Sequence, residues 1–114
     1  MLLQIVERHV DPDITVVELS GTLALGVESQ RIESLIEELV RRGSKRIVID
    51  MSGVEHIDSA GMGMVALAAG RLREAGGKLA VVASGGKVLQ ALNQTQMTTI
   101  VKVGANVAEG VAAV

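Results

Sequence analysis

The sequence predicts a single α/β domain with a mixed, mostly parallel β-sheet flanked by about four helices. Three observations support this prediction. Short apolar runs of strand length alternate with segments whose apolar residues recur at helical spacing, the pattern of parallel strands joined by crossover helices. Two β-rich segments at the start are joined by an Asp-Pro-Asp turn, which adds an antiparallel edge strand. The length of 114 residues suits one compact unit, so residues 1–114 are expected to form one domain.

The first half of the chain carries the clearest signals for individual elements. Residues 2–10 and 14–21 flank the Asp-Pro-Asp turn and form the expected hairpin. Residues 27–42 place apolar side chains at i, i+3 and i+4 and are followed by Gly43, which suits the end of a helix. Residues 46–51 have apolar side chains at both odd and even positions, as in a strand that is covered on both faces of the sheet.

The second half continues the alternation. Residues 60–75 are expected to form a helix, residues 78–83 a strand and residues 87–94 a short helix. Residues 98–103 are expected to form the last strand, and residues 107–113 a small terminal helix. The predicted order is β-β-α-β-α-β-α-β-α, and right-handed crossovers would place the parallel strands side by side.

Composition excludes several classes of function. The chain is 48% hydrophobic but has no aromatic residue to stack on a base or a sugar, and its net charge of -2 comes without a basic block, so we expect no direct nucleic-acid partner. The absence of cysteine removes disulfides and thiol chemistry. Neither a signal-peptide pattern nor a run of roughly 18 apolar residues is present, so a cytoplasmic protein without a membrane span is expected.

Ser59 lies in the stretch HIDSAGMGMV, just before the second predicted helix, where a serine could serve as a nucleophile. The nucleophile elbow G-x-S-x-G, however, needs a glycine where Ile57 stands. Both histidines, His9 and His56, also precede the serine, and they are more readily explained as surface or hydrogen-bonded residues than as a base or a metal ligand. We therefore expect no enzymatic activity, no catalytic residue and no metal site.

Two glycine-rich stretches raise the question of a nucleotide cofactor. Residues 61–66 match G-x-G-x-x-A, but nine residues separate them from the preceding strand, whereas a dinucleotide fingerprint follows its strand at once. Residues 84–88 lack the leading glycine and the Ser/Thr of a P-loop. No cofactor is predicted, although a weak nucleotide pocket stays open as an alternative.

The start of the second helix offers both a structural and a regulatory use for Ser59. Either Asp58 or Ser59 can cap the helix by accepting hydrogen bonds from its first free N–H groups. A phosphate on Ser59 would lie at the positive end of the helix dipole and would add a charge of about -1.5 to -2. Capping and phosphorylation are therefore compatible.

The residues that follow Ser59 suggest a surface that another protein can approach. Gly61 and Gly63 leave the backbone accessible around the hydroxyl group. Met62 and Met64 alternate with them, and two interpretations stay open: both methionines fill the core, or Met64 forms an exposed, adaptable contact.

The stretch RIVIDMSGVEHIDSAGMG, from Arg46 to Gly63, resembles the central signature of STAS domains, particularly of anti-sigma-factor antagonists. That signature has an aliphatic strand, then aspartate-aliphatic-serine-glycine, then isoleucine-aspartate-serine before a glycine-rich helix start. The order of elements and the total length are similar as well, so the resemblance covers essentially the whole chain.

The resemblance implies a mixed sheet flanked by helices and a partner-switching role without catalysis. In this family the unphosphorylated antagonist binds an anti-sigma factor that is also a serine kinase, and this frees the sigma factor. Phosphorylation of the serine that matches Ser59 ends the binding, and a serine phosphatase restores it. The implied partner-binding residues are Asp58, Ser59, Ala60, Gly61, Met62, Gly63, Met64, Thr22 and Ala24.

One departure from the family pattern keeps other functions open. Thr22 and Ala24 stand where signalling members carry glutamate and aspartate. One alternative is a STAS scaffold that is not phosphorylated, such as the small subunit of a lipid-transport ABC complex or part of a stress-signalling assembly. The other is a sensor that binds a nucleotide or a lipid.

Overall fold

The computed structural model describes residues 3–11, 13–23 and 27–114. These residues form one sheet with the strand order β1-β2-β3-β4-β5, from β1 (Gln4–Asp11), β2 (Ile14–Leu23), β3 (Arg46–Ile57), β4 (Lys78–Val82) and β5 (Lys102–Gly104). The α-helices of the described residues are α1 (Val27–Arg41), α2 (Ser59–Glu74), α3 (Gly86–Gln94) and α4 (Val107–Ala113). Strand β1 is antiparallel to β2 and all other neighbours are parallel, which confirms the predicted mixed sheet.

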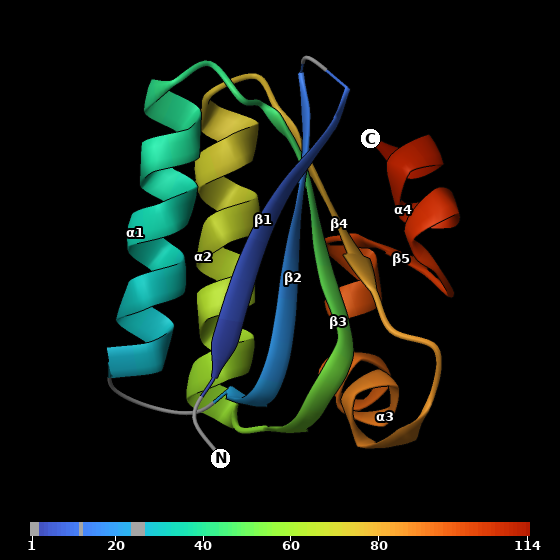
Figure 1. Cartoon of the computed structure of the whole chain (residues 1–114). Coiled ribbons are helices and arrows are strands. Elements are labelled where there is room, and N and C mark those ends of the chain that lie inside the picture. Colours follow the sequence, from blue (N-terminus) through green and yellow to red (C-terminus); the bar gives the residue numbers. More distant parts are fainter. Residues whose placement is uncertain (1–2, 12, 24–26) are drawn as a thin grey trace.

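Helices cover both faces of the sheet, as Figure 1 shows, with α1 and α2 side by side on one face and α4 against the other. The alternation along β3 explains this arrangement, because Ile47 and Ile49 belong to the large core cluster under α1 and α2. Val48 lies between them and packs instead in a second cluster with Val107 and Val111 of α4. Both parities of the strand are therefore buried, as the continuous apolar run predicts.

Two elements differ from the prediction. Strand β3 continues to Ile57 instead of ending at residue 51, because its polar second half stays paired with β2. The expected strand over 98–103 is wrong: a 3-10 turn occupies Met97–Thr99, and β5 begins only at Lys102. The β-branched residues of this segment favour a strand locally, but the buried Met97 holds the turn against the core.

Candidate functional site

The predicted site lies where the carboxyl ends of β2 and β3 meet the first turn of α2 (Figure 1). Strand β3 loses its neighbour β4 after Asp50, which is opposite Val82, and from there it pairs with β2 alone. The register between β2 and β3 shifts twice in this part, at Ser20 and at Thr22. Bulges of this kind bend a strand and are frequent beside functional sites. Here they lead the chain from the sheet to the start of α2.

The first bulge depends on a glycine. A Cβ atom at Gly53 would lie 2.9 Å from the Cβ atom of Ser20 and 3.0 Å from the carbonyl oxygen of Leu19. Contacts this short are too close for any larger residue unless β2 moves. The glycine of the predicted signature is therefore needed because the two strands approach each other closely just before the site.

Asp58, and not Ser59, is the cap of α2. Its backbone is extended, and its Oδ1 atom accepts a hydrogen bond of 2.8 Å from the backbone N–H of Gly61. Ser59 is the first residue of the helix and is exposed. Because the carboxylate of Asp58 does the capping, the hydroxyl group of Ser59 is left at the surface beside the positive end of the helix dipole.

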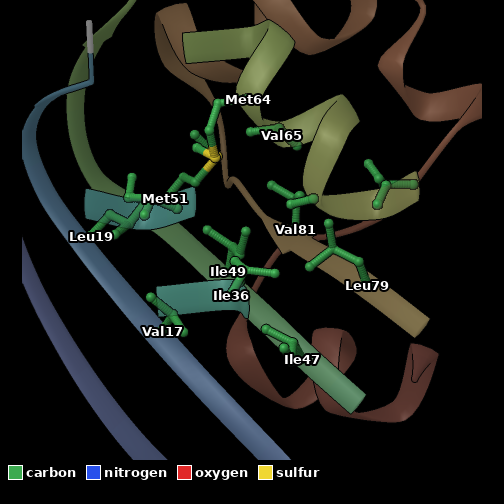
Figure 2. Packing of buried hydrophobic residues seen from close by; sticks show 14 of the residues in the cluster. Val17, Leu19, Ile36, Ile47, Ile49, Met51, Met64, Val65, Leu79 and Val81 are labelled. Atoms are coloured by element: carbon green, nitrogen blue, oxygen red, sulfur yellow. The ribbon is translucent and has the colours of Figure 1, made fainter. Parts of the chain in front are cut away.

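The two methionines of the site do not form exposed contacts. Met62 is 6% exposed and Met64 is 4% exposed, so the expectation of an exposed Met64 is wrong. Figure 2 shows Met64 directed from α2 towards Met51 on β3. The flexible thioether fills a core gap that no aromatic residue is available to fill. In the free protein, Met62 and Met64 support the site from beneath.

Leu67, and not Met64, provides an exposed apolar side chain near the site. It is 61% exposed, and it lies four residues after Gly63, which is exposed as well. Residues four apart lie on the same face of a helix, so Ser59, Gly63 and Leu67 form one outward row on α2. This spacing is the signal that identifies Leu67 once Ser59 is known to begin the helix.

The other predicted partner-binding residues vary in accessibility. Ala60 is half-buried and Gly61 is buried, which leaves little of either for direct contact. Thr22 is half-buried and its Cα atom is paired with that of His56 across the parallel ladder, so it lies beside the approach to Ser59. Ala24 lies outside the described residues.

The acidic residues nearest to Ser59 in the sequence are Glu55 and Asp58. Glu55, His56 and Asp58 are exposed, and the sequence from Ser52 to Met64 contains no lysine or arginine. The backbone N–H groups at the start of α2 are placed to stabilise a phosphate here. No group of three or more possible metal ligands occurs in the part of the chain that the structure describes.

His9 is far from this site, whereas His56 is close to it in the sequence. His9 lies on β1 opposite Thr15, near the start of β2, whereas Ser59 follows the end of β3 that adjoins the end of β2. Its ring Nδ1 lies 3.2 Å from the hydroxyl oxygen of Thr15, and its Nε2 lies 2.7 Å from Glu7. This placement fits the expectation of a hydrogen-bonded histidine.

Replacing Asp58 with alanine is expected to lower the free energy of unfolding by about 1 kcal/mol, because the N–H of Gly61 loses its side-chain acceptor. Asp58→Asn is the matched control, since asparagine caps about as well as aspartate and should retain most of the stability. Chemical denaturation of the purified variants measures the difference. Equal stability of Asp58→Ala and the parent chain would contradict the capping role.

The described residues thus define a small α/β domain whose site is an exposed serine at a capped helix start, beside an extended pair of parallel strands. The STAS domain family model matches residues 6–110, and the chain belongs to this family.

Solved structures of related proteins have the same fold. An anti-sigma factor antagonist from Mycobacterium paratuberculosis superimposes with a TM-score of 0.84 at 22% identity, over 99% of this chain and 94% of that chain. A putative anti-sigma factor antagonist from Thermotoga maritima gives 0.85 at 24% identity, over 95% and 92%. The phosphorylated form of the Bacillus cell fate determinant SpoIIAA gives 0.73 at 15% identity, over 93% and 96%.

No curated protein sequence matches the chain closely enough to count as a relative. Among the helices of the described residues, none has the length and the apolar character that crossing a membrane requires.

Proposed function

We propose that this STAS domain is a cytoplasmic anti-sigma-factor antagonist that binds an anti-sigma factor with serine kinase activity. The main observation behind this proposal is the arrangement at the start of α2, where Asp58 caps the helix and Ser59 is exposed. The likeness to several antagonist structures supports it. The protein itself carries out no chemistry and acts as the substrate of its partner.

Phosphorylation of Ser59 is the proposed switch. The contact surface consists of Ser59, Gly63 and Leu67, with Thr22 at its margin. A phosphate would place a charge of about -1.5 to -2 on a row of residues, Ser59, Gly63 and Leu67, that otherwise carries no charge. Burying that charge against a partner without a matching cation costs several kcal/mol, so the phosphorylated form dissociates. A serine phosphatase restores the binding form.

The proposal is tested by phosphotransfer to the purified chain. The kinase that co-purifies with the tagged chain is supplied with ATP, and the intact mass of the chain is measured with and without Ser59→Ala. One added phosphate on the parent chain and none on the variant support the switch. A partner that binds but never adds phosphate would favour the scaffold alternative, which the neutral Thr22 already suggests.

Leu67→Ala is expected to weaken partner binding by about tenfold, because Leu67 is the largest apolar side chain of the proposed surface, and the few central residues that dominate an interface each cost more than about 1 kcal/mol when truncated. Its 61% exposure predicts that the free energy of unfolding stays within about 0.5 kcal/mol of the parent value. Titration calorimetry with the purified partner measures the first effect, and denaturation measures the second. Unchanged affinity would remove Leu67 from the proposed surface.

A further inference from the structure

The basic side chains of this protein fall into two groups. Six arginine side chains have a hydrogen-bond or ion-pair partner: Arg8, Arg31, Arg41, Arg42, Arg46 and Arg71. Arg71, for example, lies 2.5 Å from Glu37 across the contact between α1 and α2. Within the part of the chain that the structure describes, Arg73 and all the lysines lack such partners.

Three of these unpaired cations surround one hollow. Arg73, Lys78 and Lys102 line a cavity of about 250 Å³, together with apolar residues that include Leu79 and Ile100, and none of the lining residues is acidic. Gly77 also lines the cavity, and the Cβ atom of Lys45 lies close beside it. Three of the five unpaired cations thus line one hollow, although the chain has more acidic than basic residues.

The hollow exists because the last strand is short. Strand β5 begins at Lys102, which is opposite Ala80, so the first two residues of β4 have no neighbouring strand on that side. The strand expected over 98–103 would have filled this gap. Ile100 instead precedes β5 with 43% of its surface exposed, and the last turns of α2 form the opposite wall with Ala69 and Arg73.

Gathering like charges without counter-charges is unfavourable, and a cleft that is lined by one sign of charge attracts ions of the other sign. Lysine ammonium groups and an arginine guanidinium are the side chains that proteins use to hold phosphate groups. The apolar wall adds a surface against which an organic group can lie. The volume is below the roughly 300–1,000 Å³ of pockets for larger ligands, which favours a small molecule or a headgroup.

We propose that this hollow binds a small anion of the phosphate-ester class. Its phosphate group is held by Arg73, Lys78 and Lys102, and its organic part lies against Leu79 and Ile100. The hollow is at the carboxyl end of α2, whereas Ser59 begins that helix. The proposal is therefore independent of the proposed partner switching.

The test measures binding of pyrophosphate and of glycerol 3-phosphate to the full chain by titration calorimetry, at constant ionic strength. We expect saturable binding with one site, and a dissociation constant that rises at least about tenfold in the variant Lys78→Gln/Lys102→Gln, because charge-assisted contacts are lost. Lys87→Gln is the matched control, since Lys87 is an exposed, unpaired lysine on α3 that does not line the hollow. Its dissociation constant should stay within about twofold of the parent value.

Vesicles distinguish the two sources of such a group. One outcome is that the parent chain sediments with phosphatidic acid vesicles but not with pure phosphatidylcholine vesicles. If the variant Lys78→Gln/Lys102→Gln then no longer sediments with phosphatidic acid vesicles, the site is assigned to a lipid headgroup. Binding of the free anions alone would assign it to a soluble phosphate ester. The proposal would be overturned if neither the free anions nor the phosphatidic acid vesicles bind. It would also be overturned if Lys87→Gln weakens binding as much as the double variant does. Ser59→Ala should bind these probes normally, which separates this result from a failure of the proposed switch.

Discussion

Replacing Ser59 with aspartate is expected to weaken binding to the proposed anti-sigma-factor partner by about thirtyfold or more, which corresponds to about 2 kcal/mol. The substitution puts a fixed negative charge on the exposed row that also contains Gly63 and Leu67. Desolvating that charge in the interface is unfavourable, whereas in the free protein it interacts well with the helix N-terminus. The variant should therefore fold normally and still fail to bind. Titration calorimetry and circular dichroism measure the two effects.

Two further variants make this result specific. Ser59→Ala should retain the affinity within about threefold, because it removes only a hydroxyl group that has no structural role in the cap. Ser34→Asp adds the same charge at an exposed position on α1 and should bind like the parent chain. If Ser34→Asp weakens binding as much as Ser59→Asp does, net charge and not the position of Ser59 is responsible.

The largest loss of stability is expected from Gly77→Ala. A Cβ atom at this position would lie 2.2 Å from the carbonyl oxygen of Lys45, and the next residue, Lys78, donates its N–H to that same oxygen at 2.8 Å. The clash is with backbone, so no side-chain rotation relieves it, and the start of β4 must move away from the residue before β3. We expect a loss of about 3 kcal/mol and a fall in Tm of roughly 10 °C or more.

Gly70→Ala is the matched control for this experiment. Gly70 lies inside α2, and a Cβ atom there has no neighbour within 4 Å. Alanine is the better helix former by about 0.5–1 kcal/mol, so this variant should be slightly more stable than the parent chain. The two substitutions are chemically identical, and opposite signs are expected in thermal unfolding. A stable Gly77→Ala variant would show that β4 can start without its close contact to Lys45.

The order of helices and strands could be predicted because local sequence patterns indicate each of them. Apolar side chains on both parities of residues 46–51 mark a buried strand, and helical spacing marks α1, whatever the rest of the molecule does. The position of Ser59 at a helix start could be predicted for the same reason. The choice of Asp58 as the cap could not, since either residue has a suitable oxygen and only the local backbone decides between them.

The exposure of individual side chains on α2 and the point at which β5 begins are determined only by the tertiary structure. Met64 is buried and Leu67 is exposed because of the way α2 rotates onto the sheet, and the weak amphipathic pattern of this small-residue helix does not specify that rotation. The segment before Lys102 favours a strand by propensity, but the buried Met97 keeps it in a turn. The sequence by itself therefore determined the fold family and the serine at the helix start, because these depend on local periodicity and motif. The packing of α2 and β5 determined which side chains of α2 are exposed and where the basic hollow opens, because these depend on contacts between distant parts of the chain.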